Sequence, residues 1–483
     1  MNTSLFQEKY IRVIFWIFVV FCGAAGLFFL FGGDLQDLDF SINLGQRPSP
    51  PDATVALSTP SLQPSDPPPP TAAPAATKAP RPSKSPQAHK SPQAVKTPRA
   101  SKGPPPLKTP STDQQAQEKR LLTLPYAVRV PVMKRDANKM GVVTHLKGKC
   151  QEGLNLYSSK TNGEAYLVDM DGNYLHKWGS GSFNEWENVE VEPDGDLYFL
   201  EVGIMLGKMD WDSRMLWTSD LQYHHWLSVA KNGDIYSIAW SPSEVEYKGV
   251  MVPILNDNIV ILSPGGKVKK IISLYDSLGA LIPEREFELI LQMNAPAIPS
   301  SPADVFHSNF VQKIERTIPG LCKAGDILIS SRQLNNVAIL DPQKNRLKWR
   351  WGEKEVLNVH SPFLTEDNHL LLFDNGDRDR QYSRILEIDP LSRKIVYEYK
   401  SADPEEFFST AGGAVQKLGN GNLLITETNR GKVFEITPRK KIVWEFFNPD
   451  IEGGRRSTLF RMTRLSPELS KKLMEKVKSS GGT

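Results

Sequence analysis

Two sequence patterns alternate from about residue 150 to residue 446 and restrict the folds that this chain can adopt. The first pattern is a tight turn followed by an apolar strand, and Gly or Asn in the turn supplies the positive φ that a short hairpin needs. The second pattern is two strands around a polar turn, as in VAILDPQKNRLKWRWG and VFEITPRKKIVWEF. Copies of the first pattern are PDGDLYFLE (193–201), KNGDIYSIA (231–239), KAGDILISS (323–331), EDNHLLLFD (366–374), GNGNLLITE (419–427) and a weaker EGLNLYSS (152–159).

The two patterns together describe one four-stranded unit that recurs six times. Most copies are spaced by ~40–50 residues, which is typical of the blades of a β-propeller. We therefore expect an all-β fold, a six-bladed β-propeller over residues 119–465. The aromatic residues that end most copies of the second pattern are expected to pack between blades; they are Trp178, Trp217, Trp349, Tyr397 and Trp444.

Two insertions interrupt the repeat. Residues 240–258 are expected to form a loop, and residues 272–304 to contain a helix followed by a Pro-rich turn. Connecting segments of this kind lie on the surface and often carry or cover the binding site. Residues 466–483, which follow the last repeat, are expected to form a polar helix or tail.

The N-terminal region has the pattern of a membrane anchor. Residues 13–32 are almost entirely apolar and long enough to cross a bilayer. Lys9 and Arg12 precede this run and acidic residues follow it, so residues 1–12 are expected to be cytoplasmic and the rest exported. A cleaved signal peptide is the alternative interpretation. The chain has no Asn-X-Ser/Thr sequon beyond Asn2, which favours a bacterial periplasm or cell envelope.

Residues 33–118 are predicted to be a disordered linker. From residue 46 to residue 116 the chain is rich in Pro, Lys, Ala and Ser and has no aromatic residue, so it has little apolar surface to bury. At ~3 Å per residue such a tether spans on the order of 100–200 Å. Its basic KSPQA repeats could contact anionic cell-envelope polymers, but a solvated spacer is the favoured interpretation.

Overall charge and cysteine content exclude little. The net charge is +3, which gives no argument for a nucleic-acid partner. Cys150 and Cys322 lie outside the apolar run and either form a disulfide or are both buried and free. No CxxC or Cys/His spacing indicates zinc.

Three of the eight histidines occupy matching places in the repeat. His225 lies ten residues before Ile235, and His360 lies ten residues before Leu370. His307 opens another copy, HSNFVQKI. In a propeller the first strand of each blade lines the central channel, so these imidazoles are expected to share one pocket near a channel mouth.

Other polar residues accompany these histidines in the sequence. Asn309 follows His307, Arg332 ends its second strand, and Asn375 holds the corresponding place after His360. Cationic donors and amides suit a tetrahedral oxyanion. No Cys, Asp or Glu cluster is evident beside the histidines, which argues against a metal site, and no cofactor is expected. Imidazole can itself act as a nucleophile.

The motifs HSNFVQ, ILISSRQLNNVAILD, KWRWG, LLLFDNG and GGAVQKLGNGNLLITETNRGKVFEITPRKKIVWEF, in this order, resemble the arylsulfate sulfotransferase family over about residues 150–450. The resemblance implies a six-bladed propeller that moves a sulfuryl group from a phenolic sulfate ester to a phenolic acceptor. It also implies that no nucleotide sulfate donor is needed and that a sulfated histidine is the intermediate.

The resemblance assigns roles to particular residues. His360 would be the nucleophile. The sulfuryl oxygens would be held by His225, His307, Asn309 and Arg332, and His225 or His307 could shuttle the phenolic proton. His224, next to His225, and Asn375 are further substrate-binding candidates.

This chain departs from the family pattern at two places. The family often has Asp directly after the first and last of these histidines, where this chain has Trp226 and Ser361. An inactive propeller that binds anions or acts as a scaffold is therefore the first alternative. A quinone- or metal-dependent oxidoreductase is the second.

Overall fold

The computed structural model describes residues 128–182, 184–293 and 303–481. The predicted cytoplasmic segment (1–12), membrane anchor (13–32) and linker (33–118) lie outside these residues. Within the described ranges, no helix has the length and apolar character needed to span a bilayer.

The described part is mostly β, and six sheets each contain four consecutively paired antiparallel strands. Apart from β29, the strands of three sheets come from the first half of this part. The first sheet consists of β29 (Met462–Arg464), β3 (Asn155–Ser158), β4 (Glu164–Val168) and β5 (Tyr174–Gly179). The second consists of β6 (Trp186–Val191), β7 (Leu197–Glu201), β8 (Met205–Met209) and β9 (Met215–Ser219). The third consists of β10 (Tyr223–Val229), β11 (Ile235–Tyr247), β12 (Val250–Leu262) and β13 (Val268–Ser273), with β14 (Ala303–Asp304) parallel to β12.

The other three sheets follow in chain order. The fourth consists of β15 (Ser308–Lys313), β16 (Ile327–Ser331), β17 (Asn336–Asp341) and β18 (Arg346–Trp351). The fifth consists of β19 (His360–Leu364), β20 (Leu370–Asp374), β21 (Arg384–Asp389) and β22 (Lys394–Tyr399). The sixth consists of β23 (Ala414–Lys417), β24 (Leu423–Glu427), β25 (Lys432–Ile436), β26 (Ile442–Phe447) and, at its outer edge, β2 (Gly141–His145).

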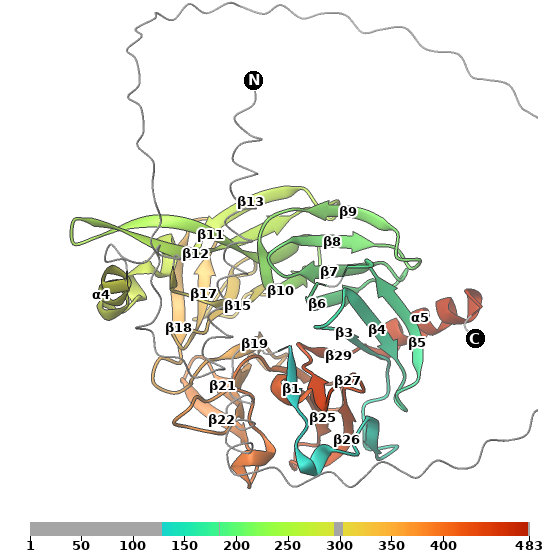
Figure 1. The fold of residues 1–483 in the computed structure, drawn as a ribbon. Coiled ribbons are helices and arrows are strands. Elements are labelled where there is room, and N and C mark those ends of the chain that lie inside the picture. Colours follow the sequence, from blue (N-terminus) through green and yellow to red (C-terminus); the bar gives the residue numbers. More distant parts are fainter. Residues whose placement is uncertain (1–127, 183, 294–302, 482–483) are drawn as a thin grey trace, which may run out of the picture. The chain divides into compact units, whose positions relative to one another are not determined.

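The six sheets surround a common centre in a propeller-like arrangement (Figure 1). Neighbouring sheets contact one another through β3, β6, β10, β15, β19 and β23, in this order. The ring closes because β23 and β24 contact β29, which is the inner strand of the first sheet. Sequence analysis did not identify β29, whose three residues are too few to show a periodic pattern.

Tryptophans connect neighbouring sheets in a regular way. In four of the six sheets, a tryptophan in the fourth strand from the centre donates its indole N–H to a backbone carbonyl in a turn of the next sheet. Each such bond satisfies a polar group that would otherwise be costly to bury. The pairs are Trp178 with Gly195 at 3.1 Å, Trp217 with Pro264 at 3.1 Å, Trp349 with Pro390 at 3.1 Å and Trp444 with Met170 at 2.9 Å.

The expectation of a loop over residues 240–258 is wrong. β11 and β12 continue as a long hairpin, with cross-strand pairs from Trp240↔Asp257 out to Tyr247↔Val250. The hairpin is stabilised by the helix that follows, because the rings of Tyr247 and Phe287 stack with centroids 4.7 Å apart. The helix expected within residues 272–304 is present as α3 (Leu274–Leu278), η3 (Gly279–Leu281) and α4 (Glu284–Met293).

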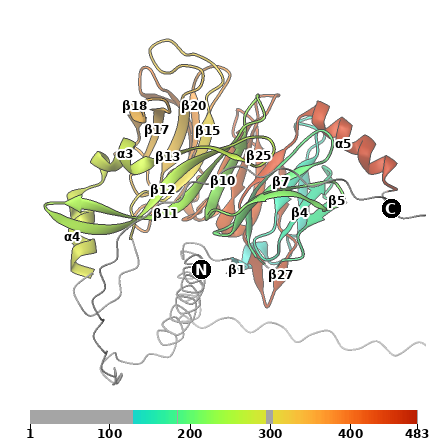
Figure 2. The same ribbon diagram turned by 90° about the horizontal axis from the view of Figure 1, so that it is seen from above.

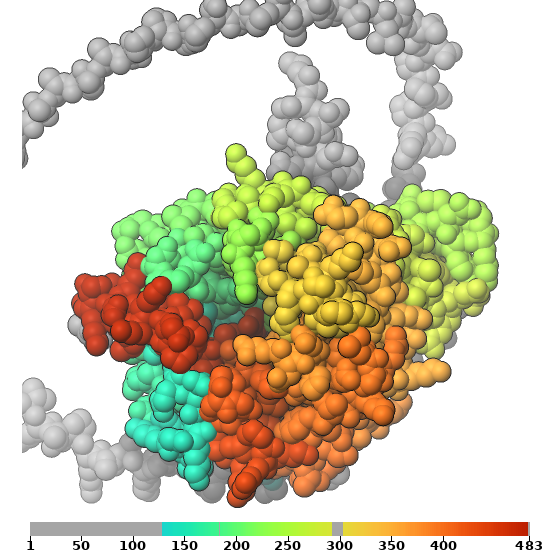
Figure 3. Space-filling model, turned by 180° about the vertical axis from the view of Figure 1, so that it is seen from behind, coloured from blue at the N-terminus to red at the C-terminus, as the bar shows by residue number. Residues whose placement is uncertain are grey.

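The two ends of the described domain lie on opposite faces (Figure 2). A small sheet of β1 (Arg129–Pro131), β28 (Arg455–Ser457) and β27 (Ile451–Glu452) lies on one face. Helix α5 (Pro467–Ser479) lies on the other, and Figure 3 shows that face with a recess near its centre. The remaining short helices are η2 (Lys134–Asp136), η4 (Pro404–Glu406) and η5 (Thr428–Arg430).

Cys150 and Cys322 are buried and do not form a disulfide. Burial raises the pKa of Cys150 to about 11 and also raises the pKa of Cys322. Both thiols are therefore protonated at neutral pH, so these residues are part of the core.

Candidate functional site

The three matching histidines lie at the start of the inner strands of three neighbouring sheets. His225 is in β10, His307 immediately precedes β15, and His360 is the first residue of β19. Each of these strands has a register shift in its first residues, which is the mark of a β-bulge. Bulges re-aim side chains next to functional sites. The backbone at His225 and His307 is also left-handed, with φ of 59° and 47°.

His225 and His307 contact each other directly. Their Nε2 atoms are 3.0 Å apart. Nδ1 of His225 lies 3.0 and 3.1 Å from the two carboxylate oxygens of Glu187, and its backbone N–H donates to Glu187 at 2.5 Å. His307 has the same arrangement with Asp304, whose carboxylate contacts Nδ1 and accepts from the His307 backbone N–H at 2.7 Å. Two carboxylates therefore flank a pair of imidazoles.

The two imidazoles of this pair have different pKa values. Burial by itself would lower the pKa of His225, but the Glu187 carboxylate outweighs it and the pKa is raised. Burial lowers the pKa of His307, and Asp304 only partly opposes this effect. Burial would raise the pKa of Glu187, but His225 and Lys160 bring it down to about 2. The positive charge of the pair is therefore more stable on His225.

His360 is held in one tautomer. Its Nδ1 lies 2.8 Å from the backbone oxygen of Asn358 and 2.7 Å from Oδ1 of Asn375. The orientation of the Asn375 amide is fixed because its Nδ2 donates to the carbonyls of Ser409 at 2.7 Å and Gly412 at 2.6 Å. Both neighbours of Nδ1 are hydrogen-bond acceptors, so Nδ1 carries the proton and Nε2 carries the lone pair.

His360 is also neutral. Burial lowers its pKa to about 3, and the positive charges of Arg332 and His225 act in the same direction. At neutral pH the ring therefore presents an unprotonated Nε2, which is the form of imidazole that can attack an electrophile.

His225 and His360 line the same narrow cavity, whose free internal volume is about 20 Å³. A space of this size admits a small polar group but not an aromatic ring. Two of the lining residues, Ala411 and Gly412, are small. The full lining is Lys160, Glu187, His225, His360, Ala411, Gly412, Thr428, Asn429 and Phe460.

Arg332 follows β16, as the sequence predicted, and lies close to the histidines. Its backbone N–H donates to the His307 carbonyl at 3.1 Å. Its side-chain Nε is buried and has no hydrogen-bond partner among the described residues. The guanidinium charge contributes to lowering the pKa of both His307 and His360. Arg332 therefore places a positive charge near the histidines, and its Nε–H is available to donate a hydrogen bond to a ligand.

Asn309 is buried and engaged in hydrogen bonds within the protein. Its Nδ2 donates to the backbone oxygen of Val359 at 2.9 Å, and its Oδ1 accepts from the hydroxyl of Ser330 at 2.5 Å. Val359 directly precedes His360, so Asn309 links the fourth sheet to the strand that carries His360.

His224 is fully buried and lies away from the cavity lining. Its Nε2 is 3.1 Å from Asp257, and its ring stacks on Trp240 with centroids 4.4 Å apart. Asp257 also accepts from the backbone N–H of Ser308 at 2.7 Å. These contacts place His224 in the packing between the third and fourth sheets.

The interpretation that no acidic residues accompany the histidines is wrong. Glu187, Asp257 and Asp304 each contact one histidine. Glu187 could have been recognised, because it occupies in the second sheet the place that His225 occupies in the third. At the two positions where the family often has Asp, this chain has Trp226 and Ser361. The ring of His225 is instead oriented by Glu187, and the ring of His360 is oriented by Asn375.

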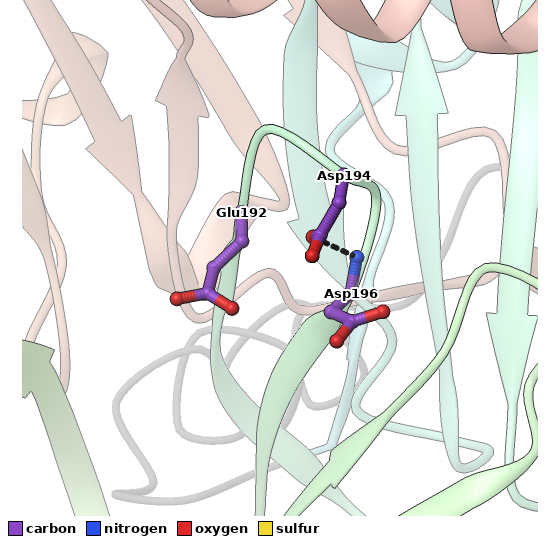
Figure 4. A group of neighbouring side chains, drawn as sticks. All are labelled: Glu192, Asp194 and Asp196. Carbon is purple, nitrogen blue, oxygen red and sulfur yellow. Dashed lines mark hydrogen bonds between the residues drawn. The ribbon is translucent and has the colours of Figure 1, made fainter. Parts of the chain in front are cut away.

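One other acidic group among the described residues could hold a metal by its geometry (Figure 4). Glu192, Asp194 and Asp196 lie in the turn between β6 and β7. Lys208 lies 2.6 Å from Glu192 and 2.9 Å from Asp196, and the backbone N–H of Asp196 donates to Asp194 at 3.1 Å. Because Lys208 already pairs with two of the three carboxylates, we assign this turn no function.

Comparisons with known proteins agree with the sequence motifs. A family model described as arylsulfotransferase (ASST) matches residues 203–449. No curated protein sequence matches the chain.

Several solved structures are similar at low identity. One is a protein of unknown function from Bacteroides caccae, at 12% identity and a TM-score of 0.45, covering 65% of this chain and 98% of that one. Another is virginiamycin B lyase from Staphylococcus aureus, at 13% identity and a TM-score of 0.38, covering 67% and 88%. A third is AztD from Citrobacter koseri, at 10% identity and a TM-score of 0.34, covering 65% and 98%.

Proposed function

This chain belongs to the arylsulfotransferase family. We therefore propose that it transfers a sulfuryl group from a phenolic sulfate ester to a phenolic acceptor, and that His360 carries the sulfuryl group between the two. No nucleotide sulfate donor takes part. The observation that carries the proposal is the fixed tautomer of His360, whose Nδ1 faces two acceptors and whose Nε2 is left unprotonated.

In the first half-reaction, Nε2 of His360 attacks the sulfur of the donor ester. The N–S bond forms as the S–O bond to the aryl group breaks, and the phenolate takes a proton from His225 or His307. The narrow cavity suits the sulfuryl group, so the aryl ring stays outside it.

In the second half-reaction, the oxygen of the acceptor phenol attacks the same sulfur. The N–S bond breaks, the lone pair returns to His360, and the phenolic proton passes to the His225–His307 pair. The products are a new aryl sulfate and an enzyme in its starting state.

Fixed positive charge favours the transition state. Negative charge on the sulfuryl oxygens and on the departing phenolate would be stabilised by Arg332 and by the cationic pair of histidines. Lys160, buried in the cavity lining, adds a further cation beside Glu187.

We assign the three remaining candidates to supporting roles. Asn375 orients His360 through Nδ1, and Asn309 holds the backbone that precedes it. His224 braces the neighbouring strands through Asp257. None of these three side chains needs to contact substrate for the reaction to proceed.

The test of the proposed function is intact-mass analysis after exposure of the full chain to 4-nitrophenyl sulfate. We expect one added sulfuryl group, located on His360 and lost on addition of a phenol. His360→Asn should not gain this mass, whereas His369→Asn, in the same sheet but beside Glu387 and outside the cavity, should gain it. Equal labelling of His360→Asn would exclude His360 as the nucleophile. Binding without any mass gain would support a binding-only propeller.

We also propose that residues 13–32 anchor the chain in a membrane, with the N-terminus in the cytoplasm and the propeller in the periplasm or cell envelope. The charge pattern around the apolar run supports this. Alkaline phosphatase fused after residue 483 should be active in intact bacteria and should sediment with membranes. An inactive fusion, or recovery in the soluble fraction, would contradict the topology or the anchor.

A further inference from the structure

We infer that His225 and His307 share a single proton, and that Glu187 and Asp304 are positioning residues that hold it on the line between the two Nε2 atoms. The inference deepens the proposed function by naming the acid and base of that site. It concerns the resting protein, so it can fail or hold separately from sulfuryl transfer.

The proton count follows from the contacts. Each Nδ1 faces a carboxylate and therefore carries a hydrogen. The two Nε2 atoms are 3.0 Å apart, which is hydrogen-bonding distance. If neither Nε2 carried a proton, two lone pairs would face each other and repel. If both Nε2 atoms carried a proton, the two N–H groups would collide. One proton is the count that this distance allows.

The carboxylates hold each histidine in the same way. Glu187 accepts from the backbone N–H of His225 and contacts its Nδ1, and Asp304 accepts from the backbone N–H of His307 and contacts its Nδ1. A carboxylate that engages both the backbone and the ring fixes the ring's rotation as well as its tautomer. The two carboxylates come from different elements, β6 and β14, so the chain has built this arrangement twice.

The surrounding charges decide which histidine holds the proton. On the Glu187 side, Lys160 contacts Glu185 and lies 3.9 Å from Glu187. Because Glu185 and Glu187 together carry two negative charges and Lys160 only one positive charge, they favour a second cation, on His225. On the His307 side, Arg332 opposes a further positive charge, and Asp304 alone favours it. His360 is neutral and adds no charge. The proton therefore rests on His225, in agreement with the raised pKa of His225 and the lowered pKa of His307.

This arrangement returns to its starting state in each catalytic cycle. In the first half-reaction the shared proton moves to the phenolate oxygen as the S–O bond breaks. The pair is then left with two opposed lone pairs, which makes it a base for the acceptor's O–H. In the second half-reaction the acceptor's proton restores the pair as its oxygen bonds to sulfur, so no other proton donor or acceptor is needed.

The kinetic test compares donors with good and poor leaving groups. In Glu187→Gln, we expect transfer from 4-nitrophenyl sulfate to fall by less than about 3-fold, and transfer from phenyl sulfate to fall roughly 10–100-fold, because only the poor leaving group depends on the acid. Glu187→Asp should recover part of the loss. Glu190→Gln, an acid-to-amide change on the same strand but outside the cavity, should leave both rates unchanged. An equal loss with both donors would indicate a structural role for Glu187 and overturn the inference.

A second measurement does not require turnover. Proton NMR of the resting protein should show a strongly downfield imidazole N–H signal that is lost in His225→Gln, in His307→Gln and in Asp304→Asn. His224→Gln, which alters the adjacent histidine, should retain it. If no such signal depends on both His225 and His307, the shared proton is excluded even when His360 becomes sulfated. If the signal is present but His360 is never sulfated, only the proposed function fails.

Discussion

The side-chain oxygen of Asn375 lies 2.7 Å from Nδ1 of His360, while the amide nitrogen of the same residue donates to the carbonyls of Ser409 and Gly412. One amide therefore connects the fifth sheet to the segment before β23 and sets the protonation of the central imidazole. The nitrogen that we propose as the nucleophile therefore depends on a residue that does not need to contact substrate.

Replacing Asn375 by Asp should change the pH dependence of the first half-reaction. A carboxylate beside Nδ1 would favour the imidazolium, so the pKa of His360 should rise and activity should be lost at a higher pH than in the wild type. The rate of 4-nitrophenolate release measured from pH 4 to pH 8 checks this. Asn420→Asp, in an exposed turn, is the control. An unchanged acid limb would show that Asn375 does not govern His360.

The buried neutral His360 should make the fold less stable in acid. Its pKa in the folded chain is about 3, below its ordinary value of 6.5, so between these two values the unfolded chain binds a proton that the folded chain does not. The free energy of unfolding should therefore fall as pH decreases below 6.5, by about 2 kcal/mol at pH 5. Urea unfolding at pH 7 and pH 5 should show this extra loss in the wild type and not in His360→Asn. Equal losses in the two proteins would contradict the prediction.

Replacing Arg332 by Gln should weaken binding of the sulfuryl group. Hydrogen bonds to charged groups contribute about 1.5–3 kcal/mol, so inhibition by inorganic sulfate should require roughly 10–100-fold more sulfate. Arg346→Gln, on the exposed edge of the same sheet, should leave inhibition unchanged. If the two variants behave alike, the Arg332 guanidinium does not face the anion.

Replacing Asn309 by Ala should affect stability more than sulfate binding. The change leaves the Val359 carbonyl and the Ser330 hydroxyl without their buried partner, which should lower the free energy of unfolding by about 1–3 kcal/mol. Denaturant unfolding and sulfate inhibition, measured on the same variant, separate the two effects. Weaker inhibition with unchanged stability would instead place this amide on the substrate.

The sequence was sufficient to predict the features of this fold that arise from local patterns. The turn-and-strand repeats predicted the six sheets because a hairpin is encoded by a few adjacent residues. The long hairpin at residues 240–258 was missed because its outer pairs are supported by Phe287 in α4, a contact between separate segments. Strand β29 was missed because it is short and pairs with a strand near the other end of the domain.

The same division applies to the site. The positions of His225, His307 and His360 could be predicted because they hold one place in the repeat. Glu187 holds the same place in its own repeat, but its contact with His225 joins two sheets and could not be predicted. The contact of Asn309 with Val359 likewise joins different sheets and leaves no local pattern. The assignment of Asn309 by resemblance therefore missed its hydrogen bonds within the protein.

The closing strand has a consequence for how this protein is made. Arg464 in β29 bonds to Asn155 in β3, although 309 residues separate them along the chain. During synthesis β3 leaves the ribosome long before its partner exists, so the first sheet remains unfinished until residues 462–464 have emerged. Phe460 and Thr428, which line the cavity, belong to the same late portion. A chain interrupted before Arg464 would carry His225, His307 and His360 yet have an open ring, so the candidate site is completed only after β29 has been synthesised.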